Sequence, residues 1–250
     1  MGLSTKLGAG RDESYWTPLL DDLPWLGDRQ TIGDMLLLAP HPDDEVLACG
    51  GLLQRWYRRA GRAEIWMVTD GEACFGDAAD TAQVGARRRD EASEAHHRLG
   101  IEVNVRWLSL PDSHVKDHLD QLRGLLDGRI GPDTVLIAPL PLDGHPDHDG
   151  TGAVAYELAL RHKLLLVQYP IWLWHWADCT YLQSGTAARL QLSAAEEIRK
   201  RDAIAAFDSQ IHPEHGTVVL PRAVLRHFRR SFEVLFVEDF RVSTHSSTVL

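Results

Sequence analysis

Five apolar runs of strand length recur along the chain, and each is followed by a turn and then by residues with helical spacing. Parallel strands need long crossover connections, usually helices, so repeated units of this kind fold into a mainly parallel sheet with helices on both faces. The sequence therefore predicts an α/β fold with a Rossmann-like arrangement. The runs are Met35–Pro40, Ile65–Thr69, Val103–Leu110, Thr134–Leu140 and Leu164–Tyr169.

Helical patterns separate these runs. A helix is expected around Val46–Trp56, and Gly100 is placed to end another that covers Ala92–Leu99. Ser193 and Glu196 form a capping box that opens a further helix. Other expected elements are helices at 119–126, at 153–160 and from Ser193 to about Phe207, and a strand at 232–237 without an assigned place in the sheet.

The 250 residues show no linker, low-complexity tract or internal repeat. We therefore expect one domain over residues 34–250, preceded by a polar lead-in over residues 1–33. The net charge of −10 argues against nucleic acid or an anionic membrane as a partner, because both require clustered Lys and Arg. Three widely spaced cysteines, no apolar run of membrane-spanning length and no signal peptide indicate a cytoplasmic protein without an integral membrane segment.

The first strand ends in an unusual cluster, in which His41 is followed by Asp43, Asp44 and Glu45. Ligands of open parallel sheets gather at the carboxyl ends of strands, where His41 lies. A helix N-terminus stabilises a carboxylate by only about 0.3–1 kcal/mol, too little to account for the whole cluster. A bound divalent cation would account for it, although acids in a first helical turn are also common without one.

A second cluster, PLDGHPDHDGTG, follows the fourth apolar run and again precedes a helix. It supplies His145 and His148, which can reach the same edge of the sheet as His41 and Asp44. Two histidines and one acid form a three-ligand site of the kind that zinc hydrolases use, with one position open for water. Such a set binds Zn²⁺ and also accepts Mn²⁺, Fe²⁺ or Co²⁺.

With these two clusters, the sequence resembles the LmbE-like, PIG-L family of zinc-dependent N-acetylglucosaminyl de-N-acetylases. The resemblance rests on APHPDDE at 39–45 and HPDH at 145–148. TDGE at 69–72 and RRDEASEAHHRLG at 88–100 lie between them in the expected order, and the likeness extends from about residue 34 to 210. Some members carry a tyrosine just before HPDH; this chain has Leu142, Asp143 and Gly144 there.

The resemblance implies a role for each matching residue. His41, Asp44 and His148 would bind the metal, and Asp43 would be the general base. His145 would act as the acid or as the oxyanion partner, as an imidazolium, and Asp147 would orient it. Arg88 would hold a sugar hydroxyl or an anionic group of the substrate.

Three further features have competing interpretations. Asp70 ends the second strand at the same edge and is either a substrate or ligand contact or a plain turn acid. Trp172, Trp174 and Trp176 alternate and would share one side of an extended segment, either against a sugar or buried in the core or at a subunit contact. His96 is expected to face solvent, and His212 and His215 to lie in a surface loop.

These observations predict a metal-dependent hydrolase that removes an N-acetyl or other acyl group from an amino sugar or glycoconjugate by attack of a zinc-bound water on the amide. Two alternatives remain. A phosphoesterase would favour a second metal and more carboxylates. A non-catalytic, metal-containing sugar-binding module would have no need for Asp43, so Asp43 favours catalysis.

Overall fold

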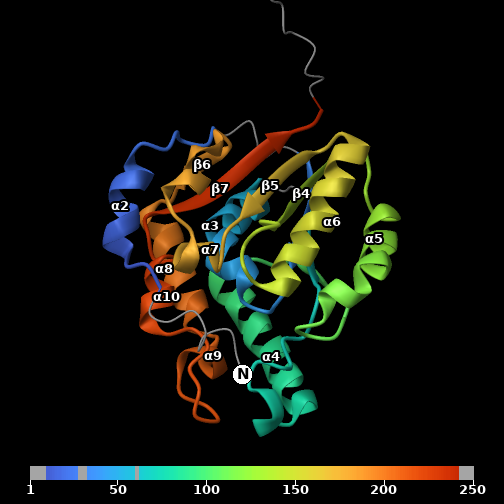
Figure 1. The fold of residues 1–250 in the computed structure, drawn as a ribbon, viewed down its shortest axis with the longest axis vertical. Coiled ribbons are helices and arrows are strands. Elements are labelled where there is room, and N and C mark those ends of the chain that lie inside the picture. The colour runs from blue at the N-terminus through green and yellow to red at the C-terminus, as the bar shows by residue number, and fades with distance from the viewer. Residues whose placement is uncertain (1–9, 28–32, 60–61, 242–250) are drawn as a thin grey trace, which may run out of the picture.

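The computed structural model describes residues 10–27, 33–59 and 62–241. Its centre is a seven-stranded sheet in the order β3-β2-β1-β4-β5-β7-β6 (Figure 1). Strands β1 to β5 are parallel, whereas β7 runs antiparallel to both β5 and β6. The strands are β1 (Asp34–Ala39), β2 (Ala63–Met67), β3 (Asn104–Trp107), β4 (Thr134–Pro139), β5 (Leu165–Tyr169), β6 (Ala187–Gln191) and β7 (Phe232–Asp239).

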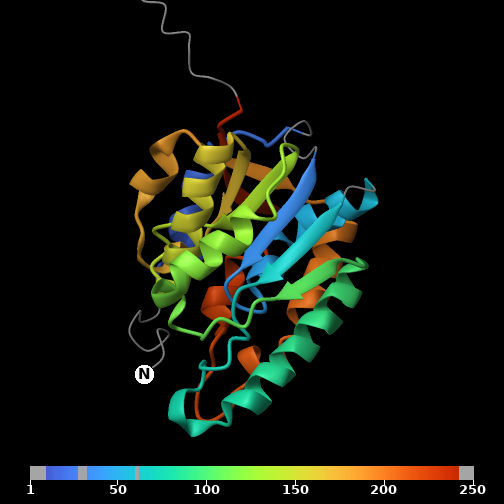
Figure 2. The same ribbon diagram turned by 90° about the vertical axis from the view of Figure 1, so that its right-hand side faces the viewer.

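Helices cover both faces of the sheet, with α5 and α6 on one side and α4 on the other in Figure 2. Alternate residues of β1 point to the two layers: Leu37 packs towards α3, α4 and α8, and Leu38 towards α5 and α6. The α-helices are α2 (Glu13–Asp21), α3 (Asp44–Arg58), α4 (Thr81–Leu99), α5 (Leu119–Asp127), α6 (Pro146–His162), α7 (Leu173–Trp176), α8 (Ala194–Ile204), α9 (Asp208–Ile211) and α10 (Arg222–Arg226). Short 3₁₀ turns are η2 (Gly76–Ala78), η3 (Val115–His118) and η4 (Cys179–Ser184).

The strand order reverses between β1 and β4, because the chain moves outward to β2 and β3 and then returns to the other side of β1. In open α/β sheets, ligands bind in the crevice at such a reversal, beyond the carboxyl ends of the strands. Helix α3 begins directly after β1, and α6 begins soon after β4. Both histidine-containing clusters therefore lie at this crevice.

The predicted α/β fold class is confirmed, and each of the five apolar runs overlaps a strand, although β2 begins two residues earlier than its run. Gly100 ends α4 in the left-handed conformation with φ 73°, and the capping box of Ser193 and Glu196 opens α8 as expected. Strand β6 was not predicted. The strand expected at 232–237 is β7, which lies between β5 and β6.

The expected polar lead-in contains a helix that the sequence patterns did not reveal. Helix α2 buries Trp16 and Leu20 completely in the layer that includes α3 and α8. Trp16 Nε1 also donates a hydrogen bond to the Trp174 carbonyl at 2.9 Å. Residues 1–9 and 28–32 of the lead-in lie outside the described residues. Across the parts of the chain that are described, no helix is long and apolar enough to cross a membrane.

Gly152 sets the position of the helix that carries HPDH. A Cβ atom at this position would lie 2.5 Å from the Pro139 carbonyl oxygen and 2.8 Å from Pro141 N. Helix α6 can therefore pack directly on the end of β4 only because residue 152 lacks a side chain. This close contact places His145 and His148 beside the end of β1.

Candidate metal centre and active site

His41, Asp44 and His148 meet at the carboxyl ends of β1 and β4. Their facing atoms form a small triangle: His41 Nδ1 lies 3.1 Å from His148 Nε2 and 3.5 Å from Asp44 Oδ2, and His148 Nε2 lies 3.3 Å from Asp44 Oδ2. Ligand atoms bound to a tetrahedral zinc ion at about 2.0–2.1 Å lie roughly 3.3 Å apart. The donor set and its spacing therefore fit one divalent cation.

Within the described part of the chain, two other groups of ligand-type side chains share His41. One combines it with His145 and His148, and the other with Asp112 and Asp147. The first lacks a carboxylate to balance the charge of a cation. In the second, both carboxylate oxygens of Asp147 already accept backbone N–H groups. The triangle that includes Asp44 is the group that suits a cation best.

The charges around the triangle favour positive charge at its imidazoles. Although burial opposes it, Asp44 and Asp143 raise the pKa of His148 to about 9. His41 is also buried, and the acids around it raise its pKa well above the usual value. Burial alone would raise the pKa of Asp44, but the two imidazoles hold it well below its usual range. A divalent cation would satisfy the same acids by displacing the imidazole protons.

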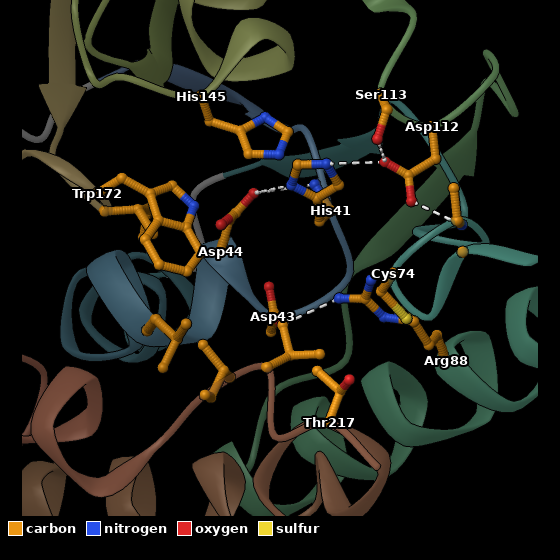
Figure 3. A pocket seen from close by; sticks show the side chains of 16 residues that line it. His41, Asp43, Asp44, Cys74, Arg88, Asp112, Ser113, His145, Trp172 and Thr217 are labelled. Atoms are coloured by element: carbon orange, nitrogen blue, oxygen red, sulfur yellow. Dashed lines mark hydrogen bonds and ion pairs between the residues drawn. The ribbon is translucent and has the colours of Figure 1, made fainter. Parts of the chain in front are cut away.

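Asp43 lies beside the triangle and is held by Arg88, whose Nη2 donates to Asp43 Oδ2 at 3.0 Å (Figure 3). Burial raises the pKa of Asp43 to about 7, although Arg88 acts in the opposite direction. The backbone of Asp43, at φ 158°, has a conformation that residues other than glycine seldom adopt. Its carboxylate is therefore fixed at the cavity by an ion pair and an unusual backbone turn.

Arg88 is almost fully buried, and both of its terminal nitrogens are used within the protein. Nη1 donates to the Gly71 carbonyl at 2.9 Å, and Nη2 donates to the Pro42 carbonyl at 3.1 Å as well as to Asp43. A Cβ atom on Gly71 would lie 1.9 Å from Arg88 Nη1, and Gly71 has φ +64°, so glycine is required there. The resemblance implied a substrate contact for Arg88; the structure places it to hold Asp43.

His145 caps the N-terminus of α6, and its Nδ1 accepts the backbone N–H of Asp147 at 3.2 Å. This hydrogen bond assigns the ring proton to Nε2. Burial, together with repulsion from His41 and His148, lowers the pKa of His145 to about 2. The ring is therefore a neutral donor at the cavity, whereas an imidazolium was expected.

The Asp147 carboxylate does not reach His145, which differs from the expected orienting role. Its Oδ2 lies 3.2 Å from His41 Nε2 and accepts the Ser113 N–H at 2.7 Å, and its Oδ1 accepts the Val115 N–H at 3.0 Å. Asp147 therefore fixes the ring of His41. Only its backbone N–H positions His145.

Asp112 is a cavity residue that the sequence reasoning missed. Its Oδ1 lies 3.2 Å from His41 Nε2, and its Oδ2 accepts the Ala73 N–H at 2.8 Å (Figure 3). The signal was present, because Asp112 follows the third apolar run just as the two clusters follow the first and fourth. The strand-end rule that found those clusters applies equally to Asp112.

Asp143 is a second missed residue, and it is completely buried. One of its oxygens lies 2.7 Å from His148 Nδ1. The carboxylate also accepts backbone N–H groups from residues 171, 172 and 173 at 2.9–3.0 Å, and Trp176 Nε1 donates to its carbonyl at 2.7 Å. Asp143 therefore fixes the ring of His148 and anchors the start of α7. Its position before HPDH gave no sign of these partners, which come from the residues between β5 and α7 and from α7 itself.

The structure also shows where Asp70, His96 and the histidines at 212 and 215 lie. Asp70 pairs with Arg89 at 2.6 Å and is not among the residues that line the cavity. His96 is buried against Glu45, with Nε2 to Oε1 at 2.9 Å, so the prediction that it faces solvent was wrong. His212 and His215 are exposed in a loop, as predicted.

The segment predicted to be extended and to present three tryptophans on one side is instead the short helix α7 with its flanking residues. Because the segment turns as a helix, the three tryptophan rings point in different directions. Trp172 lines the cavity, Trp174 is buried in the core, and Trp176 contacts the Asp143 carbonyl. Alternation failed as an indicator here because four residues are too few to distinguish a strand from one helical turn.

A cavity of about 320 Å³ opens beside the triangle. Figure 3 shows polar side chains on one side, where Asp112, Ser113 and Arg88 lie, and Trp172 on the opposite side, with Asp43 and Asp44 between them. This volume is typical of a site for a small organic molecule. The cavity is thus bordered by a triangle of side chains that fits one cation, by the buried carboxylate of Asp43 and by the neutral imidazole of His145.

Comparisons with known proteins point to one family. Residues 36–159 match the family model described as PIG-L, GlcNAc-PI de-N-acetylase. The 2'-N-acetylparomamine deacetylase of Streptomyces fradiae is 29% identical, in an alignment that covers 54% of this chain and 56% of that protein. The alignment thus spans little more than half the length of that relative.

Solved structures of deacetylases share the fold. The N,N'-diacetylchitobiose deacetylase from Pyrococcus horikoshii superposes with a TM-score of 0.63 at 19% identity, covering 91% of this chain and 93% of that one. An antimicrobial pseudoaglycone deacetylase gives a TM-score of 0.62 at 19% identity, covering 84% of this chain and 99% of that one.

Proposed function

The chain belongs to the PIG-L family of de-N-acetylases, and on this premise we propose that it hydrolyses the N-acyl group of an amino sugar or sugar conjugate. The observation that carries the proposal is the triangle of His41, Asp44 and His148, at 3.1–3.5 Å, with Asp43 directly beside it. A site that only binds sugar has no need for a buried carboxylate next to a cation. The similarity to an acetylparomamine deacetylase supports an amino-sugar substrate.

His41, Asp44 and His148 would hold the cation, and zinc suits two imidazoles with one carboxylate. When bound, the cation supplies Lewis acidity, which lowers the pKa of water and polarises the amide carbonyl. Asp147 and Asp112 fix His41, and Asp143 fixes His148, so the two ligand rings are oriented before any ion binds.

Asp43 would act as the general base that takes a proton from the attacking water. Its Oδ2 is fixed by Arg88, and a carboxyl pKa near the working pH suits proton transfer in both directions. Water adds to the carbonyl carbon, the C–N bond breaks, and the nitrogen leaves with a proton delivered by Asp43. The products are the free amine and a carboxylic acid.

His145 would donate a hydrogen bond from Nε2 to the oxygen that becomes negatively charged during attack. Its Nδ1 is occupied by the Asp147 backbone, which keeps the proton on the side of the cavity. Loss of one such donor typically reduces the rate by about 100- to 1,000-fold. The polar side of the cavity, with Asp112 and Ser113, would receive the sugar hydroxyls.

Amine release from a panel of N-acetylated amino sugars and glycoconjugates, with the protein loaded with one equivalent of Zn²⁺, tests the proposal. We expect hydrolysis that stops on chelation and returns when Zn²⁺ is restored. Asp43→Ala should abolish turnover while the protein keeps its zinc. Turnover that survives both chelation and Asp43→Ala would refute the proposal.

A further inference from the structure

Five apolar side chains from three separate parts of the chain line the cavity, and we call them the apolar wall: Leu47, Ile171, Trp172, Val219 and Leu220. Of these, Trp172 lies opposite Asp112 and Ser113 (Figure 3). Leu47 follows Asp44 by three residues and so lies on the same face of α3. An apolar surface of this extent inside an active-site cavity gains stability when an apolar group of the substrate covers it.

The structure fixes this wall before any ligand binds. The backbone of Ile171 and Trp172 is tied to the Asp143 carboxylate. The loop that carries Val219 is closed by reciprocal backbone hydrogen bonds between Glu214 and Thr217, at 2.9 Å each. The Glu214 carboxylate also pairs with Arg87 of α4 at 2.6 Å. A preformed wall contributes to affinity because little ordering is needed when the ligand binds.

Val219 and Leu220 lie outside residues 36–159, the part of the chain that matches the family model. The match to the family model therefore says nothing about this part of the cavity lining. Val219 and Leu220 bear on which substrates fit the cavity and not on how the metal is bound.

The position of the amide indicates which part of the substrate covers the wall. An N-acyl amino sugar has its hydroxyl-bearing ring on the nitrogen side of the amide and its acyl chain on the carbonyl side. If the sugar faces Asp112 and Ser113, the acyl chain leaves the reacting carbon in the opposite direction. That direction is towards Trp172, with Asp43 and Asp44 in between (Figure 3).

We propose that the chain prefers N-acyl groups longer than acetyl, whose alkyl chain lies on the wall formed by Leu47, Ile171, Trp172, Val219 and Leu220. This inference rests on the proposed amide hydrolysis. The reaction is unchanged: water adds, the C–N bond breaks, and the products are the amino sugar and a fatty acid instead of acetic acid. An acetyl methyl group would leave most of this wall uncovered.

The test is a series of N-acyl glucosamines with acetyl, butyryl and hexanoyl groups, hydrolysed by the zinc-loaded protein. We expect kcat/KM to rise by roughly 15-fold from acetyl to butyryl, because each of the two added methylenes contributes about fourfold when buried. A second series keeps the acetyl group and lengthens an alkyl aglycone from methyl to octyl. The rise should occur in the first series and not in the second.

A filling variant sharpens the test. Val219→Phe should occupy the wall and lower kcat/KM for the hexanoyl substrate by about 10-fold or more, with a smaller loss for the acetyl substrate. Val218→Phe is the matched control, because Val218 is adjacent but does not line the cavity. Its profile should equal that of the unsubstituted protein. The profile of the unsubstituted protein decides the question even if Val219→Phe fails to fold.

The outcomes separate the two proposals. Hydrolysis of acetyl substrates with a flat or falling acyl profile would overturn the acyl-chain inference and leave the amidase proposal standing. A rise that follows the aglycone would overturn it as well, because the wall would then face the sugar side. Absence of hydrolysis throughout both series and the glycoconjugate panel would refute the proposed function itself.

Discussion

Helix α3 contacts two buried groups of charged residues that differ in how their charges are balanced. Near its middle, Glu233 accepts the backbone N–H groups of Gly51 and Leu52, at 2.6 and 3.0 Å, and the Lys200 ammonium at 2.7 Å. A Cβ atom on Gly51 would lie 3.3 Å from the Glu233 carboxylate, so glycine allows this approach. Every charge in this group has a partner of opposite sign. We call it the closed pair.

The group at the N-terminus of α3 is not balanced in this way. Its carboxylates outnumber its only guanidinium, Arg88, and its three imidazoles are neutral in a metal-bound state. It also borders a cavity, whereas the closed pair does not share that cavity. Either imidazole protons or a divalent cation that displaces them can balance this group. The acids are Asp43, Asp44, Asp112, Asp143 and Asp147.

Loss of a ligand at the unbalanced group should have the largest effect. His148→Ala removes one corner of the triangle, so we expect loss of stoichiometric zinc and a fall in kcat/KM of at least about 1,000-fold. Metal analysis after gel filtration and amine release measure the two effects. Chelation of the unsubstituted protein should reproduce them. Full zinc content in His148→Ala would contradict the assignment.

Asp43→Asn should separate binding from chemistry within the same group. The amide cannot take a proton from water, so kcat should fall by about 100- to 10,000-fold. Zinc content should stay at one equivalent because Asp43 is not at a corner of the triangle. Parallel loss of zinc and activity would instead make Asp43 a ligand.

Substitution in the closed pair should lower the stability of the protein and leave metal binding unchanged. Lys200→Met leaves the Glu233 charge buried without its ammonium partner, so the free energy of unfolding should fall by about 3–5 kcal/mol. Urea titration measures this change, and Arg201→Met, an exposed position of the same helix, is the control. Zinc affinity of the folded variant should be unchanged. A loss of zinc comparable to that in His148→Ala would erase the distinction between the two groups.

Asp143→Asn tests the support of a ligand ring. An amide is a weaker acceptor than a carboxylate for the backbone N–H groups and for His148 Nδ1–H, so the ring is held less firmly and is a weaker ligand. Zinc affinity should therefore fall by about 10- to 100-fold. Chelator competition gives the affinity. Asp149→Asn, in the first turn of α6 and bonded to Gly144 N, should change it little. Equal affinities in both variants would mean that Asp143 serves only the fold.

The smallest effect is expected at Asp70. Its carboxylate pairs with Arg89 and does not line the cavity, so Asp70→Ala should change kcat/KM by less than about threefold, in line with the small contribution of partly exposed ion pairs. Steady-state kinetics with the preferred substrate measure it. A loss above tenfold would restore Asp70 as a substrate contact.

The parts of the site that could be predicted from the sequence are those set by local chain geometry. HPDDE and HPDH follow strands that neighbour each other at the point where the strand order reverses, so the strand-end rule brings His41, Asp44 and His148 together. Strand β6 and helix α2 were missed. Helix α2 is stabilised largely by the burial of Trp16 and Leu20 against residues far away in the sequence.

The same limit explains where the side chains of the site lie differently from what was expected. Whether Arg88 contacts substrate or Asp43, and whether Asp147 reaches His145 or His41, depends on side-chain directions across different elements. The partners of Asp143 come from residues 171–173, at the other end of a crossover. Periodicity carries no information about such contacts.

The central claim is that one divalent cation binds between His41, Asp44 and His148. Anomalous diffraction from crystals of the zinc-loaded protein, recorded above and below the zinc absorption edge, tests it directly. We predict a single peak about 2.0–2.2 Å from His41 Nδ1, Asp44 Oδ2 and His148 Nε2. A peak among His41, Asp112 and Asp147, or no peak in this cavity, would contradict the account.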